Sequence, residues 1–299
     1  MDIQSLFSVK DKVVLVTGGA KGVGRMISEA FVRNGAKVYI SSRDAAACRA
    51  ACAELNALPG ARGADAATPL PADLSRLDEC RRLARELAAR EPALHVLVHN
   101  SGATWGEAYD AFPDAAWSKL LALNLQRVFS LTQALTPLLE AAAASAAQQQ
   151  QQQQQPGSSS SSSSGSGSGG EAGGPAVAAD PARVIHIGSI DGIRVPALPT
   201  FAYSASKAGL HQLSRHLAAE LGPRGITSNT LACGPFPSRM MAATLREFGD
   251  TIRAANPLGR IGAPSDVGGA CLFLASRAGA FVNGATLVLD GGLSLMSKI

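Results

Sequence analysis

Residues 13–24 read Val13-Val14-Leu15-Val16-Thr17-Gly18-Gly19-Ala20-Lys21-Gly22-Val23-Gly24. The run begins with apolar, mostly β-branched residues, which are typical of a buried strand, and continues with glycines that permit a tight turn. A helical pattern follows over residues 24–34 and is closed by Gly35. Because a helix N-terminus presents unpaired N–H groups and the positive end of its dipole, this order predicts a pyrophosphate-binding turn. A plain tight turn is the alternative.

Strand and helix patterns alternate from this turn to the end of the chain. Apolar runs predict strands at residues 12–16, 37–41, near 70, 94–99, 183–187, 227–232 and 286–289. Helical periodicity predicts helices at residues 24–34, 43–58, 77–89, 117–140, 203–221 and 266–275. Such alternation produces right-handed crossovers, so the predicted fold class is α/β, with a single doubly wound parallel sheet of the Rossmann type.

One segment departs from this pattern. Residues 141–180 are almost wholly Ala, Gln, Ser and Gly, which predicts a disordered insertion with no share in a core. The other residues of the 299, namely 1–140 and 181–299, are then expected to form one domain. An insertion between a helix and the next strand belongs at the amino edge of a parallel sheet, whereas ligands bind at the carboxyl edge. We therefore expect the insertion to be remote from any chemistry.

Composition excludes several classes of partner. The net charge of +4 is scattered without a basic run, so no nucleic acid is expected. No apolar run reaches the roughly 20 residues of a membrane helix, and residues 1–5 lack the pattern of a secretory signal. The five cysteines form no CxxC pair and the five histidines share no ligand spacing, so we expect reduced thiols and no metal. A cytoplasmic location is expected; Ser297-Lys298-Ile299, which resembles the S-K-L address, indicates the peroxisome as the alternative.

The glycine spacing T-G-x-x-x-G-x-G resembles that of the short-chain dehydrogenase/reductase family, and further elements of the family pattern follow in order. They are Asp73-Leu74, His99-Asn100-Ser101-Gly102, Asn124, Ile187-Gly188-Ser189, Tyr203-x-x-x-Lys207 and Asp290-Gly291-Gly292. The second element differs from the family's N-N-A-G at its first and third places. Together the motifs span nearly the whole chain outside the insertion, so the resemblance implies a nicotinamide-dependent oxidoreductase.

The resemblance implies a catalytic tetrad of Asn124, Ser189, Tyr203 and Lys207. In this family the tyrosine donates a proton, the serine orients the substrate carbonyl, the lysine contacts the ribose and the phenol, and the asparagine holds a relaying water. The residues themselves agree with part of this, because Tyr203 and Lys207 are four apart and share a helix face. A nearby ammonium is expected to lower the pKa of a phenol from about 10 toward neutrality. Alone, such a Tyr–Lys pair would more often be a surface pair.

The end of the second predicted strand indicates which cofactor is used. It reads Ser41-Ser42-Arg43, with no carboxylate before Arg43, and Lys21 adds a second cation from the glycine turn. Two cations and two hydroxyls suit a 2′-phosphate, so NADPH is expected over NADH. In the alternative, Arg43 only begins a helix and Asp44 binds the ribose. The residues expected at the cofactor are Gly18, Lys21, Gly22, Val23, Gly24, Ser42, Arg43, Asp73, Leu74, Asn100, Ser101, Gly102, Tyr203, Lys207 and Gly234.

Within the family, several runs resemble the 3-oxoacyl-[acyl-carrier-protein] reductases of rhamnolipid biosynthesis. They are residues 42–45 with Cys48, and residues 104–106, 210–215 and 236–240. This resemblance implies reduction of a small-molecule carbonyl, a 3-oxoacyl thioester linked to acyl-carrier protein or coenzyme A. Another ketone or alcohol (a sugar, polyol or steroid) and a cofactor-binding protein without turnover are the alternatives. A homo-oligomer, dimeric or tetrameric, is expected by analogy.

Residues 235–256 follow the sixth predicted strand and are expected to form a lid over the substrate. Its apolar lining would be Phe236, Met240, Met241, Leu245 and Phe248. Ordinary helix packing explains this stripe nearly as well. The family usually has Pro-Gly where this chain has Cys233-Gly234-Pro235, so the proline that fixes φ comes two residues later and the lid is expected to start at a different angle. Cys233 is expected to be a buried inert thiol rather than an oxidisable one.

Overall fold

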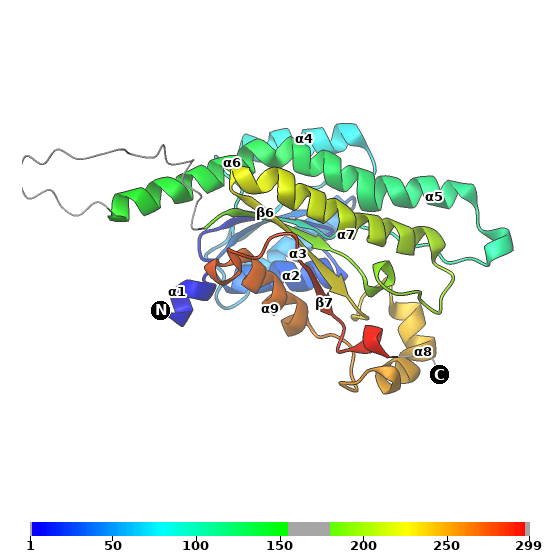
Figure 1. Cartoon of the computed structure of the whole chain (residues 1–299). Coiled ribbons are helices and arrows are strands. Elements are labelled where there is room, and N and C mark those ends of the chain that lie inside the picture. Colours follow the sequence, from blue (N-terminus) through cyan, green and yellow to red (C-terminus); the bar gives the residue numbers. More distant parts are fainter. Residues whose placement is uncertain (1, 155–179, 297–299) are drawn as a thin grey trace, which may run out of the picture.

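The computed structural model describes residues 2–154 and 180–296 (Figure 1). Within these ranges one sheet of seven strands runs in the order β3-β2-β1-β4-β5-β6-β7, and each neighbouring pair is parallel. The strands are β1 (Val13–Thr17), β2 (Lys37–Ser41), β3 (Ala67–Pro69), β4 (Val96–His99), β5 (Ala182–Ile187), β6 (Ile226–Cys233) and β7 (Thr286–Leu289). The strand order reverses between β1 and β4, which is where such sheets bind ligands. The predicted α/β, doubly wound class is confirmed.

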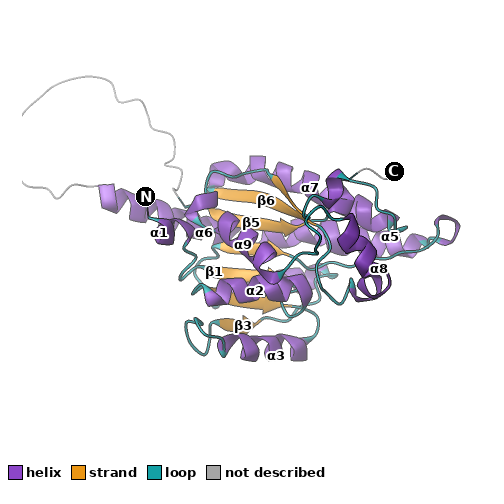
Figure 2. Cartoon of the chain, turned by 90° about the horizontal axis from the view of Figure 1, so that it is seen from below, coloured by secondary structure: helices purple, strands orange, loops and turns teal. Residues whose placement is uncertain are grey.

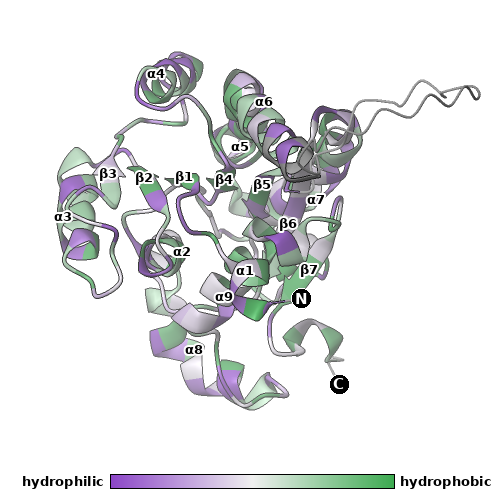
Figure 3. Cartoon of the chain, turned by 90° about the vertical axis from the view of Figure 1, so that its left-hand side faces the viewer, coloured by the Kyte–Doolittle hydropathy of each residue, from purple (hydrophilic) through white to green (hydrophobic). Residues whose placement is uncertain are grey.

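Helices cover both faces of the sheet (Figure 3). On one face lie α2 (Gly22–Arg33), α3 (Ala45–Asn56) and α9 (Pro264–Ala275) (Figure 2). On the other lie α4 (Leu77–Ala88), α5 (Asp114–Leu121), α6 (Arg127–Gln154) and α7 (Phe201–Leu221). The short helix α1 (Ile3–Phe7) precedes β1, and α8 (Ala242–Ala255) follows β6.

The central strands are buried from end to end because both of their faces are covered. In β1, Val14 and Val16 contribute to the core under α2 and α9, while Val13 and Leu15 contribute to the core under α4 and α6. Successive side chains of a strand point to opposite faces, so an unbroken apolar run feeds both cores. This is the physical reason why the sequence of β1 reads as a continuous run rather than an alternation.

The largest differences from the sequence-based expectations lie in the helical region before the insertion. The helix expected over residues 117–140 is interrupted by a π-helical turn, Ala122–Gln126, and α6 then continues to Gln154. Ala142 and Ala143 are buried, so the expectation that nothing from residue 141 onward joins a core is wrong at these positions. Alanine is the best helix former, and the alanine run prolongs the helix beyond its expected end. The rest of the expected insertion, residues 155–179, lies outside the described residues, as does the C-terminal tripeptide 297–299.

The described residues that flank the insertion lie at the amino edge of the sheet. The side chain of Asp180 pairs with Lys12, the residue immediately before β1, at 2.7 Å. In Figure 1 this edge lies opposite the end of the molecule that carries α8. Among the described helices, none is long and apolar enough to cross a membrane.

Candidate active site

The glycine turn lies between β1 and α2 at the carboxyl edge of the sheet. Gly18 has a positive φ of 65°, and a Cβ on Gly24 would lie 2.3 Å from the carbonyl oxygen of Gly18, so no larger residue fits there. The Asn100 side chain donates to the carbonyls of Thr17 and Gly18, at 3.0 and 3.3 Å. The N-terminus of α2 has no side-chain cap from Lys21, which leaves its first N–H groups for a ligand. This cradle fits a pyrophosphate.

Thr17 links the turn to the end of β4. Its hydroxyl accepts the backbone N–H groups of Asn100 and Ser101, at 2.9 and 3.0 Å, and donates to Val98. A Cβ on Gly102 would lie 3.2 Å from Asn124 Oδ1 and 3.8 Å from Lys207 Nζ. The predicted cofactor residues of β1 and β4 therefore lie side by side, next to two members of the predicted tetrad.

The charged residues at the end of β2 have distinct partners. Asp44 caps α3 by accepting the Ala47 N–H at 2.9 Å, and it pairs with Lys21 at 3.1 Å. These interactions, the backbone hydrogen bond first, lower the pKa of the Asp44 carboxyl. Arg43 is exposed and forms no ion pair with any described residue. Asp44 is thus already engaged by Ala47 and Lys21, whereas Arg43 has no partner of this kind among the described residues.

Two predicted contacts at the adenosine end change in detail, those of Ser41 and Leu74. Ser41 is fully buried, so the expectation that both hydroxyls after β2 meet a 2′-phosphate is wrong for Ser41 and open only to Ser42. The side chain of Leu74 lies in a core, so only its backbone can face a cofactor. Asp73 accepts the N–H and the hydroxyl of Ser75, at 3.1 and 2.8 Å, which orders the loop after β3.

Tyr203 and Lys207 lie one turn apart on α7, with Lys207 Nζ 5.7 Å from the centre of the Tyr203 ring. Lys207 is buried and donates to the carbonyl of Ile187, the last residue of β5, at 2.7 Å. Burial lowers the pKa of Lys207 to about 8. The ammonium therefore keeps its charge only below that pH.

The Tyr203 phenol differs from the sequence-based expectation. Burial raises the pKa of Tyr203 to about 12, and the hydrogen bond with Ser189 opposes this only in part. The expectation that Lys207 brings the phenol toward neutrality is therefore wrong for the protein alone, because loss of hydration disfavours the phenolate and the nearby Asp191 and Cys233 raise the pKa further. The phenol retains its proton at neutral pH, which is the state that a proton donor requires.

Ser189 lies at the carboxyl end of β5 and is 7% exposed. Its hydroxyl oxygen accepts the N–H of Asp191 at 3.1 Å, and its backbone N–H donates to His211 Nε2 at 3.4 Å. The burial of Asp191 raises the pKa of its carboxyl, against the opposing charge of Arg194. Ser189 is thus held on two sides, beside the Tyr203 phenol.

Asn124 lies in the π-helical turn, and its carboxamide is almost fully used by the protein. Oδ1 accepts the Ala103 N–H at 2.9 Å, while Nδ2 donates to the Ala103 carbonyl at 2.9 Å and to the Ser206 hydroxyl at 3.0 Å. Within the described structure this side chain therefore fastens the loop after β4 to α7. The water-holding role implied by the family resemblance stays a prediction.

Cys233 and Gly234 close the site from β6. Cys233 is buried, and burial raises the pKa of its thiol to about 12, so it is an inert thiol next to Lys207, as expected. A Cβ on Gly234 would lie 2.7 Å from the Cβ of Asp290. Glycine is required there because the loops after β6 and β7 come so close.

Only some of the apolar side chains expected to line the lid are accessible to a substrate. Phe236 is 3% exposed and packs in the core against Gly262, so its expected role as substrate lining is wrong. Met240 and Phe248 are exposed and remain free for a substrate. Ser238, which belongs to the expected lid but was not predicted at the glycine turn, has its Cβ 3.1 Å from where a Cβ on Gly22 would lie. Its place five residues after the end of β6, in a loop over the carboxyl edge, is the sequence signal for this position.

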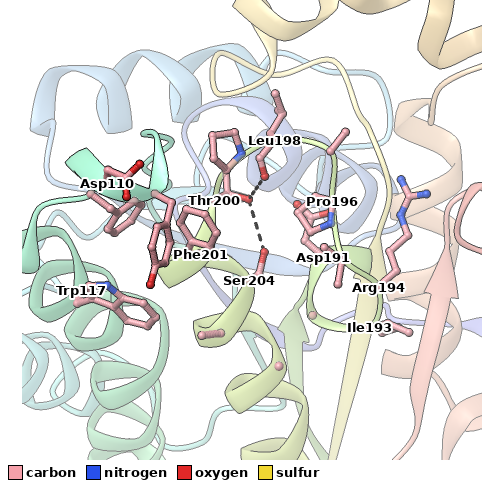
Figure 4. Close-up of a pocket in the computed structure, with 18 residues that line it drawn as sticks. Asp110, Trp117, Asp191, Ile193, Arg194, Pro196, Leu198, Thr200, Phe201 and Ser204 are labelled. Carbon is pink, nitrogen blue, oxygen red and sulfur yellow. Dashed lines mark hydrogen bonds between the residues drawn. The ribbon is translucent and has the colours of Figure 1, made fainter. Parts of the chain in front are cut away.

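A cavity of about 1060 Å³ lies against the N-terminal part of α7 (Figure 4). Trp117 and Phe201 contribute to one side, and Asp191 and Arg194 to the other. Phe112, which also lines the cavity, packs edge-on against both Trp117 and Phe201. It reaches Asp191 and Ser204, which are close in sequence to Ser189 and Tyr203, but none of the predicted tetrad lines it. The cavity therefore adjoins the predicted catalytic groups without containing them.

Comparisons with known proteins agree with this architecture. Residues 12–149 match the family model for short chain dehydrogenases, and residues 162–294 match that for enoyl-(acyl carrier protein) reductases. The chain is 36% identical to the rhamnolipids biosynthesis 3-oxoacyl-[acyl-carrier-protein] reductase of Pseudomonas aeruginosa, covering 97% of this chain and 98% of that protein. It is 31% identical to the galactitol 2-dehydrogenase (L-tagatose-forming) of Cereibacter sphaeroides, covering 99% and 100%.

Solved structures give the same relation. The NADP active-site complex of RhlG from Pseudomonas aeruginosa superposes with a TM-score of 0.81 at 36% identity, covering 97% of this chain and 99% of that one. A gluconate 5-dehydrogenase from Burkholderia cenocepacia, in complex with NADP and tartrate, superposes with a TM-score of 0.77 at 25% identity, covering 99% and 100%. The chain therefore belongs to the short-chain dehydrogenase/reductase family of oxidoreductases.

Proposed function

We propose that this protein is an NADPH-dependent reductase that converts a carbonyl to a secondary alcohol, with a 3-oxoacyl thioester as its substrate. The observation that carries the proposal is that Tyr203 contacts the Ser189 hydroxyl on one side and Lys207 on the other, with Lys207 Nζ within 4 Å of the space beside Gly102. A proton donor, a carbonyl-orienting hydroxyl and a cation thus lie next to the glycine cradle. This is the set of groups that carbonyl reduction needs.

The residues around the cradle fit a phosphorylated dinucleotide. Gly18 and Gly24 leave room for the pyrophosphate, and the uncapped N-terminus of α2 supplies N–H donors. Arg43, exposed and free of ion pairs among the described residues, is available for a 2′-phosphate. Both solved structures described above contain NADP, which supports this choice. When bound, the cofactor would supply the hydride.

Three side chains would then orient the substrate, donate the proton and stabilise the phenolate that remains. The Ser189 hydroxyl donates a hydrogen bond to the substrate oxygen and orients the carbonyl. The Tyr203 phenol, protonated at neutral pH, gives its proton to the same oxygen as negative charge develops there. The Lys207 ammonium favours the phenolate that remains, because an opposite charge stabilises the ionised form.

Two observations favour an acyl substrate over a sugar. The 3-oxoacyl reductase is more similar to this chain than the galactitol dehydrogenase, and Met240 and Phe248 present exposed apolar surface from the lid segment. The sugar and polyol dehydrogenases among the relatives support a polyhydroxy ketone as the second candidate.

The test follows NADPH absorbance with acetoacetyl and longer 3-oxoacyl thioesters, L-tagatose and a simple ketone. We expect NADPH to be oxidised faster with the thioesters than with L-tagatose, and NADH to be the poorer cofactor. Tyr203→Phe is expected to lower kcat by a factor of about 10² to 10⁴ while cofactor binding is retained. Preference for L-tagatose would overturn the substrate, preference for NADH would overturn the cofactor, and full activity of the phenylalanine variant would overturn the mechanism.

The assembly state belongs to the same proposal. Leu287 and Val288 of the edge strand β7 are exposed, and so is Phe281 in the segment before it. Exposed apolar side chains on an edge strand favour association with another chain. This supports the homo-oligomer expected from the family. Light scattering on the purified protein would measure its mass, and a monomer at micromolar concentration would contradict the expectation.

A further inference from the structure

We propose that His211 is a positioning residue, whose imidazole holds the end of β5 so that the Ser189 hydroxyl meets the Tyr203 phenol. The inference rests on the proposed function, since it assigns a role in the same reaction. His211 contacts neither the cofactor cradle nor the cavity beside α7 among the described contacts, so its effect would be exerted through Ser189.

The first observation is a stripe on α7. Tyr203, Lys207 and His211 follow one another at intervals of four residues, which places them on one face of the helix. Lys207 donates to the carbonyl of Ile187, and His211 Nε2 accepts the N–H of Ser189. The helix therefore fastens the last carbonyl of β5 and the first amide beyond Gly188. These two contacts fix the backbone on both sides of Gly188, the residue that precedes Ser189.

The second observation is the space that the imidazole takes. A Cβ on Gly188 would lie 2.3 Å from His211 Nε2, and a Cβ on Gly192 would lie 2.9 Å from His211 Cε1. At Gly188 the ring is the nearest group, whereas at Gly192 the backbone of α7 comes as close as the ring, with Lys207 C and Ala208 N both at 2.8 Å. Neither glycine has a positive φ, so close approach of α7, rather than an unusual backbone conformation, explains both. The turn from Gly188 to Gly192 therefore packs directly against this face of α7, with the His211 ring at its Gly188 end.

The charge state of the ring suits an acceptor. His211 is buried, and burial together with the charges of Lys207 and Arg215 lowers its pKa to about 4. At neutral pH the imidazole is therefore uncharged, with its proton on Nδ1 while Nε2 accepts from Ser189. The uncharged His211 ring therefore places no second positive charge close to the Lys207 ammonium.

The consequence reaches the reacting groups through Ser189. Its backbone is held by His211, its hydroxyl accepts the N–H of Asp191, and the same hydroxyl partly offsets the rise in the pKa of the Tyr203 phenol. Without the acceptor, the Ser189 amide would be left buried and unpaired, and the turn would shift to satisfy it. A displacement of about 1 Å at such a group can lower the turnover rate by about 10²-fold.

The experiment compares His211→Met with His211→Gln in the full-length protein. Methionine fills a similar volume without the acceptor, whereas the glutamine oxygen can occupy the place of Nε2. We expect methionine to lower kcat by about 10- to 100-fold, with KM for NADPH changed less than about twofold. Glutamine is expected to restore kcat to within a few-fold of the wild type. His216→Met, at an exposed histidine of the same helix, is the matched control and is expected to leave kcat unchanged.

Each outcome bears on the proposal. Wild-type kcat in His211→Met would overturn it, and so would equal losses with methionine and glutamine, because packing alone would then explain the residue. Thermal unfolding of each variant shows whether it is folded; if the methionine variant is not, His211→Asn, whose shorter amide does not reach the Nε2 position, replaces it against glutamine. Failure of the proposed function is distinguishable, since the wild type would then oxidise NADPH with none of the carbonyl compounds.

Discussion

At the scale of single residues, burial shifts the pKa values of Tyr203 and Lys207, which both lie on α7, in opposite directions. It raises the pKa of Tyr203 to about 12 and lowers that of Lys207 to about 8. Burial disfavours whichever form is charged, so it pushes an acid and a base in opposite directions. The phenol is therefore protonated throughout the neutral range, while the neighbouring ammonium loses its charge as the pH rises through about 8.

A pH dependence follows from this separation. We expect kcat/KM for carbonyl reduction to be constant below about pH 8 and to fall above it, because the cation that favours the phenolate disappears. The other group that acts on Lys207, the Cys233 thiol, has its pKa raised to about 12 and does not titrate in this range. NADPH oxidation followed from pH 6 to pH 10 measures the profile.

Lys207→Arg is the control for this assignment. Arginine stays charged throughout the range, so the basic limb is expected to disappear even if overall activity is lower. A wild-type profile that stays level to pH 10, or an arginine variant with the same limb as the wild type, would contradict the assignment of the limb to Lys207.

At the scale of elements, a charged cluster ties α9, β1 and β5 together at the amino edge. Lys12 donates to the carbonyl of Ala275 at 3.0 Å, and Arg183 donates to those of Leu274 and Ser276, both at 2.9 Å. These carbonyls belong to the C-terminal end of α9, where cations are favourable. Asp180 balances both cations, at 2.7 Å from Lys12 and 2.9 Å from Arg183.

Replacing Asp180 by asparagine tests this cluster. Arg183 is 1% exposed, so the change leaves a buried guanidinium without its counter-charge. We expect the free energy of unfolding to fall by about 2–3 kcal/mol, less than for a fully buried pair because the Asp180 side chain is 28% exposed. Urea unfolding measures the loss. Asp250→Asn, at an ion pair with Arg253 in which the Asp250 side chain is fully exposed, is the control and is expected to change little. Equal losses in both variants would refute the role of burial.

At the scale of the whole molecule, the amino edge and the carboxyl edge of the sheet carry different groups. The amino edge carries Asp180 and the ion cluster, while the carboxyl edge carries the glycine turn, Ser189 and the N-terminal part of α7. In Figure 1 the amino edge and the carboxyl edge lie at opposite ends of the strands. Parallel strands impose this separation, because every strand enters at one edge and leaves at the other.

This separation predicts that the inserted segment is dispensable for turnover. Deletion of residues 148–174, which begins inside α6 and continues beyond the described residues, is expected to leave kcat and KM within about twofold of the wild type. NADPH oxidation and thermal unfolding would be compared in the two proteins. A large loss of kcat in a deletion variant that unfolds at the wild-type temperature would show that the insertion acts on the site.

Most of the fold could be predicted because its signals are local. The apolar run of β1 and the glycines after it specify a strand and a turn within twelve residues, and Tyr203 and Lys207 share a helix face by spacing alone. The end of α6 could not be predicted from composition, since alanine suits both a helix and a low-complexity segment. The burial of Ser41 and Phe236 depends on which elements cover them, and this is not written in their neighbouring residues.

The amino-acid sequence by itself determined the order of strands and helices, the glycine turn and the identity of the groups proposed for catalysis, because period and spacing act over a few residues. Only the tertiary structure decided the protonation of Tyr203, the partners of Asn124 and the contact between His211 and Ser189. The physical reason is that hydration and hydrogen bonding depend on neighbours in space. His211 and Ser189 are 22 residues apart in the chain, and they meet only because β5 and α7 pack against each other.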